Sequence, residues 1–458
     1  MSNPAIEIDR GARPFERTRA ATIAAWAFAI AVGAFLAVSM FNNGRMTRKE
    51  LRLIPTLPYD ERVDFAYFYA AATMVWHGDG DELYPQKYEY IFYPGDPAFD
   101  QTQDNYLRAR LLARGNYYNP PILAILEAPL TSMSFASAFW TYSAVSVGAF
   151  ALFLLLFWRA GRGIPELPLV ILGMAAFRPV HEAIIMGHQS LFFVLAMGAG
   201  FLALRAKQNF LAGLCLSLLA IKPQWAILPG LFLLVRGEWR AGFAMALGAL
   251  ALFGLPFIAT GKSSFLNYFH FLRDQSSSDL VNAPHMFSWN GFLSKLQPNN
   301  PFTAPIPDVN KDILYGLEAV TLLVVLFIWM GRDLYLGVAA TVIGMLLVST
   351  HSVWYDWAFL VVAAAFIILR PMPAFVRAQS WVFLLALFVS SAQSTAAVFA
   401  PDGRHGFLHW SEPAFFSVTL VAAGTLLWIA GRVVLEGQIH LPWRRGSSAA
   451  GGALVPAG

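Results

Sequence analysis

The stretch Ala136–Trp158 reads ASAFWTYSAVSVGAFALFLLLFW and contains no charged residue. An α-helix rises about 1.5 Å per residue, so a stretch of this length crosses the roughly 30 Å hydrocarbon core of a bilayer once. A run of this kind is typical of a transmembrane helix. It therefore predicts that the protein resides in a membrane.

Similar apolar runs recur along the chain. The other long uncharged runs are Ala21–Phe41, Ala241–Thr260, Leu334–Thr350, Ser380–Ala400 and Ala414–Ala430. Shorter or interrupted apolar segments are Pro120–Met133, Leu167–Phe177, Leu191–Leu204, Phe210–Ile221, Trp225–Val235, Ile313–Met330 and Val353–Leu369. Together these runs predict an all-α polytopic membrane protein with about 11–13 transmembrane helices.

The composition supports the same class. Of the 458 residues, 57% are hydrophobic and 13% are charged, whereas a soluble globular protein carries about 25% charged residues. This excludes a disordered chain and a coiled coil, and the single cysteine, Cys215, excludes a disulfide scaffold. The net charge of +4 is explained by basic cytoplasmic loops and by attraction to anionic membrane lipids, so we expect no nucleic-acid partner.

Basic residues set the predicted orientation. The positive-inside rule assigns the short connections rich in Lys and Arg to the cytoplasm. The residues so assigned are Arg10, Arg13, Arg17, Arg19, Arg159, Arg162, Arg205, Lys207, Arg236, Arg240, Arg332, Arg370, Arg377, Arg432, Arg444 and Arg445. The N-terminus is therefore predicted to be cytoplasmic. How Pro120–Met133 crosses the membrane is left open, because hydropathy alone does not settle it.

This orientation gives a domain organisation. We expect a cytoplasmic segment over residues 1–20, one membrane domain over 21–432 and a disordered cytoplasmic tail over 433–458. Residues 42–119 and 261–312 are expected to form two outer loops, because both stretches are rich in polar residues.

The first outer loop offers a candidate catalytic residue. It contains Asp64, followed by FAYFYAAATMVW, which is expected to lie along the membrane interface as a helix with its aromatic rings at headgroup depth. Asp64 would then be a carboxylate held at the membrane surface. Such a group suits a general base that acts on a sugar hydroxyl whose partner is lipid-linked.

Polar residues that interrupt the apolar runs are further candidates, because a charged group at membrane depth costs several kcal/mol. Lys222, Pro223 and Gln224 interrupt one such run. Lys222 either extends to the lipid headgroups as an ordinary loop residue or binds a phosphate.

Two more polar groups face the same predicted surface. His351, Tyr355 and Asp356 lie at the start of an apolar run, where Asp356 is either a helix cap or a site residue. His188 and Gln189, with Ser190, precede another run, where they either cap a helix or belong to a site.

At these residues the chain resembles glycosyltransferase family 87 of the GT-C superfamily, whose members use polyprenyl-phosphate sugars. The resemblance is carried by four stretches in the family's order, over about two thirds of the chain. These are VDFAYFYAAATMVWHGDGDELY at Val63–Tyr84, YYNPPILAILEAPL at Tyr117–Leu130, GHQSLFFVLAMGAGFLALRAKQNFLAGLCLSLLAIKPQ at Gly187–Gln224 and HSVWYDWAFLVVAA at His351–Ala364. Asn119, before the Pro-Pro pair, departs from the family pattern, and residues 94–115 form an insert in the first loop.

The resemblance implies a GT-C architecture, with interfacial helices in the large outer loop and an active site at the outer, periplasmic face of a bacterial-type plasma membrane. It implies inverting transfer of mannose or another hexose or pentose from a polyprenyl-phosphate donor to a lipid or glycan acceptor. Asp64 matches the family's catalytic acidic residue, which acts as a base and takes the proton of the acceptor hydroxyl.

The remaining roles follow from the chemistry that this reaction requires. The lipid phosphate that leaves needs positive charge or oriented donors, for which we select Lys222, Gln224 and His351. His188, Gln189, Tyr355, Asp356 and Asn119 are the candidate sugar- or acceptor-binding residues. The outer-loop carboxylates leave a divalent metal open as a cofactor, although no ligand spacing indicates one.

A second class of function uses the same residues. A transporter or flippase of a lipid-linked glycan would line its pathway with these polar groups. Such proteins often carry inverted repeats with broken helices at matching positions. The sequence shows one broken site, at Lys222 and Pro223, and no symmetric partner for it.

Overall fold

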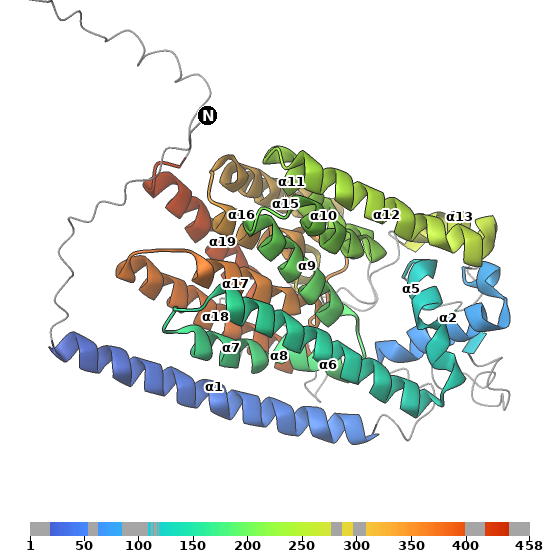
Figure 1. The fold of residues 1–458 in the computed structure, drawn as a ribbon, viewed down its shortest axis with the longest axis horizontal. Coiled ribbons are helices and arrows are strands. Elements are labelled where there is room, and N and C mark those ends of the chain that lie inside the picture. The colour runs from blue at the N-terminus through green and yellow to red at the C-terminus, as the bar shows by residue number, and fades with distance from the viewer. Residues whose placement is uncertain are drawn as a thin grey trace, which may run out of the picture.

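The computed structural model is built of α-helices and short 3-10 helices in the part of the chain that it describes (Figure 1). It describes residues 19–53, 63–84, 109–110, 113, 117, 119–275, 286–295, 308–398 and 417–438. The helices of the first part of the chain are α1 (Arg19–Leu53), α2 (Asp64–His77), η2 (Gly80–Glu82), α5 (Pro121–Glu127) and η3 (Ala128–Ser132). The helices of the middle of the chain are α6 (Phe135–Ala160), α7 (Leu167–Ala175), α8 (Arg178–Ile185), α9 (Ser190–Arg205), α10 (Asn209–Ser217), η4 (Leu218–Ile221), α11 (Pro223–Val235) and α12 (Trp239–Ala259). The last helices are α13 (Gly261–Gln275), α14 (Trp289–Lys295), α15 (Asp308–Met330), α16 (Leu334–Val348), η6 (Asp356–Phe359), α17 (Leu360–Leu369), α18 (Ala374–Val398) and α19 (Val418–Leu435).

The helices confirm the predicted class, an all-α polytopic membrane protein. In the described residues seven helical segments are long and apolar enough to cross a membrane, and six further apolar helical segments are shorter. Large apolar side chains of the long helices face outward, as Phe243 (67% exposed), Leu250 (70%) and Leu323 (65%) do. Such exposure would be costly in water and is ordinary where lipid is the solvent.

Parts of both predicted outer loops are helical. Helix α1 continues past Phe41 to Leu53, and α13 and α14 lie within residues 261–312. Helix α2 is present where an interfacial helix was expected, but its residues from Phe65 to Met74 are mostly buried in protein. The predicted segments 1–18 and 439–458 and most of 85–116 lie outside the described residues.

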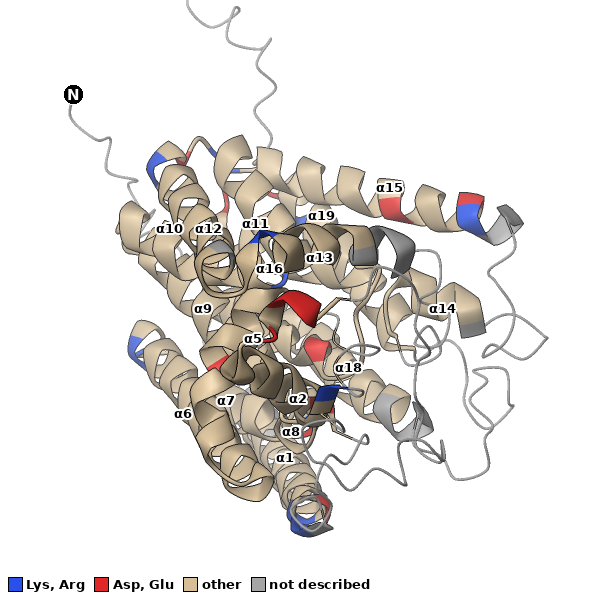
Figure 2. Cartoon of the chain, turned by 90° about the vertical axis from the view of Figure 1, so that its right-hand side faces the viewer, with Lys and Arg blue, Asp and Glu red and all other residues tan. Residues whose placement is uncertain are grey.

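Helices α2, α5 and α13 gather at one end of the molecule (Figure 1). Helix α2 packs against α5 and η3, and α13 packs against η2 and α12. Figure 2 looks at this end and shows the three helices in front of the long ones. This end therefore covers the termini of the central helices.

Helices α16 and α17 form the centre of the bundle. Residues Leu336–Leu347 of α16 are all buried, and in α17 nearly every residue is buried as well. A helix that is apolar on all sides is stable where protein surrounds it. Because α16 and α17 are surrounded by other helices, they need not be long enough to span a lipid layer alone.

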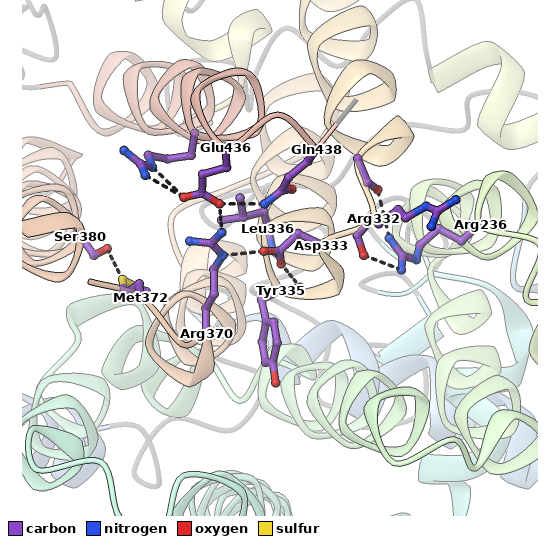
Figure 3. A network of polar contacts seen from close by, with 12 residues as sticks. Arg236, Arg332, Asp333, Tyr335, Leu336, Arg370, Met372, Ser380, Glu436 and Gln438 are labelled. Atoms are coloured by element: carbon purple, nitrogen blue, oxygen red, sulfur yellow. Dashed lines mark hydrogen bonds and ion pairs between the residues drawn. The ribbon is translucent and has the colours of Figure 1, made fainter. Parts of the chain in front are cut away.

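An ion-pair network closes the end of α17 that is remote from η6 (Figure 3). The Arg370 guanidinium contacts the Asp333 carboxylate at 2.5 Å and also pairs with Glu436, which in turn pairs with Arg432. The Arg370 side chain is 8% exposed. Nearby, Arg236 donates to the backbone carbonyls of Gly331 and Arg332. Residues from α15, α16, α17 and α19 are thus tied together, and several arginines that the sequence assigned to one side lie at one end.

We expect Arg370→Leu to destabilise the protein by about 2 kcal/mol, because it leaves the half-buried carboxylates of Asp333 and Glu436 without the buried Arg370 cation. Thermal unfolding of the purified protein in detergent would measure this as a lowered Tm. The exposed Arg162, changed to Leu, serves as the control. An unchanged Tm for Arg370→Leu would contradict the structural role of the network.

Candidate active site

A close backbone contact holds Asp64 at the start of α2. The N–H of Phe65 donates to the carbonyl of Met186 at 3.0 Å. The next residue, Gly187, has φ +59°, and a Cβ at this position would lie 2.6 Å from the Phe65 Cβ. The loop that carries His188 can therefore approach Asp64 closely because residue 187 has no side chain.

Four polar side chains form a buried chain of contacts beside this loop. Lys222 Nζ lies 2.9 Å from His188 Nε2, and His188 Nδ1 lies 2.7 Å from Ser190 Oγ. Ser190 Oγ donates to Asp356 Oδ1 at 3.1 Å. The backbone N–H of Ser190 also donates to His188 Nδ1, at 3.2 Å. The chain of contacts thus runs from the Lys222 amine to the Asp356 carboxylate.

Asp356 is both a structural residue and a member of this chain of contacts. Its Oδ2 accepts from the N–H of Val353 at 3.2 Å, which fixes the turn before η6. Its Oδ1 accepts from Ser190 of α9. The sequence left a cap and a site residue as alternatives for Asp356, and its two oxygens make contacts of both kinds.

Tyr355 connects this chain of contacts with Asp64. Its ring lies 4.1 Å from the ring of His188, centroid to centroid, and its hydroxyl donates a hydrogen bond to the Asp64 carboxylate. His351 is half-buried and interacts electrostatically with Asp64, Asp356 and His188. Residues far apart in the sequence thus meet around one point.

Burial and charge oppose each other at Asp64 and Lys222. Burial raises the pKa of the Asp64 carboxyl above its usual value, while the Tyr355 hydroxyl and the Lys222 ammonium act in the opposite direction. Burial lowers the pKa of the Lys222 ammonium, and the carboxylates of Asp356 and Asp64 counteract that shift. Asp64 is half-buried by its accessible surface, so its carboxyl remains reachable by a substrate.

Asn119 and Gln189 form a second polar pair next to His188. Gln189 Nε2 donates to Asn119 Oδ1 at 3.0 Å, and both side chains are buried. The backbone carbonyl of Asn119 accepts from the Tyr84 hydroxyl at 2.6 Å, which links the first loop to this pair. The Gln189 amide is thereby held in one orientation.

Gln224 is the one candidate that the structure leaves apart. It is half-buried in the first turn of α11, and it makes no recorded hydrogen bond to the groups around Asp64 within the described residues. For a metal, the described part of the chain holds no group of three or more His, Cys, Asp or Glu side chains that could bind one.

The comparison with protein families agrees with this geometry. The family model described as Glycosyltransferase family 87 matches residues 117–354, more than half of the chain. The chain belongs to glycosyltransferase family 87. No curated protein and no solved structure matches it. The resemblance seen in the sequence is thus confirmed, and the protein is a multi-pass membrane glycosyltransferase.

The family 87 match covers part of the site. It contains Asn119, His188, Gln189, Lys222, Gln224 and His351, and it leaves Asp64, Tyr355 and Asp356 outside. The fold nevertheless places Tyr355 and Asp356 against the matched residues His188 and Ser190.

Two features of this family 87 site were missed by the sequence reasoning. Ser190 was left open as a cap or a site residue and was given no role, yet it joins His188 to Asp356. Glu127 was not singled out, although it is the one acidic residue in the apolar stretch PPILAILEAPL and is 5% exposed. The rule that charged groups at membrane depth are functional candidates would have identified Glu127.

We expect Gly187→Ala to reduce glycosyl transfer by about tenfold to a hundredfold, because the added Cβ pushes Phe65 and with it Asp64 out of position. Gly163→Ala is the matched control, since Gly163 also has a positive φ but has open space around it. Initial rates and Tm would be measured for both variants. Equal activity of the two would show that the contact at Gly187 does not position Asp64.

Proposed function

We propose that this protein transfers a sugar from a polyprenyl-phosphate donor to a hydroxyl of a lipid or glycan acceptor, with inversion at the anomeric carbon. The sugar is mannose or another hexose or pentose. The reaction takes place at the outer, periplasmic side of a bacterial-type inner membrane, with the N-terminus in the cytoplasm. The observation that carries the proposal is the half-buried Asp64 carboxylate, which accepts a hydrogen bond from Tyr355 and interacts electrostatically with the buried Lys222.

Asp64 is the general base of the proposed reaction. It takes the proton of the acceptor hydroxyl while that oxygen attacks the anomeric carbon. The bond between this carbon and the phosphate oxygen breaks, and polyprenyl phosphate leaves with the electron pair. The raised pKa of Asp64 makes it a better proton acceptor than an ordinary aspartate, as this role requires.

Lys222 and His351 are the groups proposed to stabilise the leaving phosphate. Among the described residues, Lys222 is the one lysine with a buried side chain, and a cation in a site with little water stabilises developing negative charge strongly. The carboxylates of Asp356 and Asp64 favour its charged form and counteract the lowering of its pKa by burial. Gln224 adds a donor near the start of α11, where the helix dipole also favours an anion.

Asn119, His188, Gln189, Tyr355 and Asp356 are proposed to bind the sugar and the acceptor. The polar groups converge on one point, which suits a single reaction centre. A transporter site would instead lie between two structural repeats with broken helices at matching positions, and the sequence shows no symmetric partner for the break at Lys222 and Pro223. This favours the enzyme over a flippase.

The decisive experiment uses purified protein, radiolabelled polyprenyl-phosphate sugars, with the mannose form first, and a membrane lipid extract as acceptor. We expect Asp64→Asn to lower transfer about a thousandfold, since a general base contributes typically 10²–10⁴-fold. Asp81→Asn, in the exposed part of η2, is the matched control. If wild type consumes none of the donors, the proposed function is wrong, whereas full activity of Asp64→Asn would refute only the role of Asp64.

The pH profile tests the same assignment through Tyr355. Tyr355→Phe removes a hydrogen bond that lowers the pKa of Asp64, so this pKa rises further and the base becomes protonated at higher pH. We therefore expect the acid limb of kcat/KM to move to higher pH. Tyr69→Phe is the control. Tyr69 lies on α2 with Asp64, but its hydroxyl donates to the Met133 carbonyl. A shift to lower pH, or none, would contradict the contact between Tyr355 and Asp64.

A further inference from the structure

A second polar site lies beside the reaction centre, in a cavity of about 380 Å³ between α5–η3, α6, α9 and η4. Its wall is mostly apolar, with Leu123, Phe192 and Ile221 among its residues. This volume falls in the range of small-molecule binding sites.

The polar groups of this cavity are buried and include acceptor oxygens without partners. Glu127 lines it and is 5% exposed, and the Tyr142 hydroxyl faces its carboxyl as a donor. Since one hydroxyl donates one hydrogen bond, an oxygen of Glu127 and Gln189 Oε1 remain unbonded within the described part of the chain. Leaving such groups unpaired in an apolar wall costs several kcal/mol, so a ligand that bonds to them would be favoured.

The cavity also meets the lipid-facing surface. Leu126, Val145 and Leu218 belong to its wall and are 54%, 56% and 44% exposed. Apolar side chains exposed on a membrane helix face lipid tails. A molecule with an alkyl or isoprenyl chain can therefore enter this cavity sideways from the bilayer.

The polar end of the cavity points toward the reaction centre. Gln189 follows His188 in the chain and is bonded to Asn119. The Tyr142 ring packs 5.2 Å from the ring of Phe65, the residue after Asp64. A head group bound to Glu127 and Gln189 would therefore lie next to Asp64.

The unbonded atoms determine which head group fits. The carboxyl oxygens of Glu127 and Gln189 Oε1 are acceptors, so the ligand has to donate hydrogen bonds. A phosphate offers mainly acceptor oxygens, which cannot donate to the oxygens of Glu127 and Gln189. A head group with several hydroxyls satisfies all of these atoms and leaves one hydroxyl for the reaction.

We propose that this cavity binds the acceptor, a lipid with a polyhydroxylated head group, and that Glu127 selects that head group through its hydroxyls. This inference rests on the proposed glycosyl transfer, because it assigns the acceptor to one side of the same reaction centre. The lipid chain lies along the apolar wall, and the donor phosphate binds on the side of Lys222.

The test uses two photoreactive probes with the same dodecyl chain carrying a diazirine, one with a glucoside head and one with a phosphate head. We expect the glucoside probe to label peptides of α6 and α9 around Val145 and Phe192. Glu127→Leu should lower this labelling about fivefold, the effect of losing one or two hydrogen bonds. Glu318→Leu on α15 is the control, because Glu318 is a half-buried acid of another apolar helix and does not line the cavity.

Each outcome decides the proposal. Preferential labelling of the cavity by the phosphate probe would identify it as the groove of the donor chain and overturn the assignment, as would equal labelling of wild type and Glu127→Leu. Stronger labelling by a dodecylammonium probe would indicate that the cavity binds an amine head group, and it would overturn the assignment of a hydroxylated head group too. The Tm of each variant shows whether it is folded. If Glu127→Leu is not folded, Glu127→Gln, whose side chain has nearly the same shape as glutamate, takes its place.

The transfer assay separates this inference from the proposed function. If wild type transfers sugar, Glu127→Leu should raise the acceptor concentration at half-maximal rate about fivefold and leave that of the donor unchanged. An unchanged acceptor dependence would refute the role of Glu127 while the glycosyl transfer stands. If no donor is consumed by wild type, the proposed function fails, and the labelling alone decides whether the cavity binds hydroxylated lipids.

Discussion

The contact between Lys222 and His188, which carries on through Ser190 to Asp356, is the interaction on which the site depends. A buried ammonium is costly unless its charge is compensated nearby. The carboxylates of Asp356 and Asp64 supply this compensation. The four groups of the contact lie at the beginnings of three helical segments, namely α9, α11 and η6. Because all three have to start at one place, the arrangement of the bundle and the chemistry of the site are determined together.

The sequence predicts much of this because lipid leaves charged residues few places to lie. The apolar runs gave the fold class, and the polar residues that interrupt them, such as Lys222 and Asp356, proved to be neighbours. The contacts between these side chains could not be predicted from the sequence. Whether Asp356 bonds to Ser190 or only to its own turn depends on how α9 and η6 pack, and hydropathy carries no information about packing between helices.

Helix α2 shows a different limit of the sequence. Its residues FAYFYAAATMVW are apolar and aromatic, a composition equally compatible with a membrane interface and with a protein interior. The small residues Ala70, Ala71 and Ala72 are fully buried, which is typical of close helix packing rather than of headgroup contact. Asp64 therefore begins a helix that is held in place by surrounding protein.

The length of α17 has a consequence for the depth of the site in the membrane. From Asp356 to Arg370 the chain runs through η6 and α17, 4 and 10 residues long, which together span about 23 Å. This is less than the roughly 30 Å of a hydrocarbon core, so the reaction centre and the Arg370 network cannot both reach the two surfaces of an undeformed bilayer. At most one of these two polar clusters can therefore lie level with the lipid headgroups.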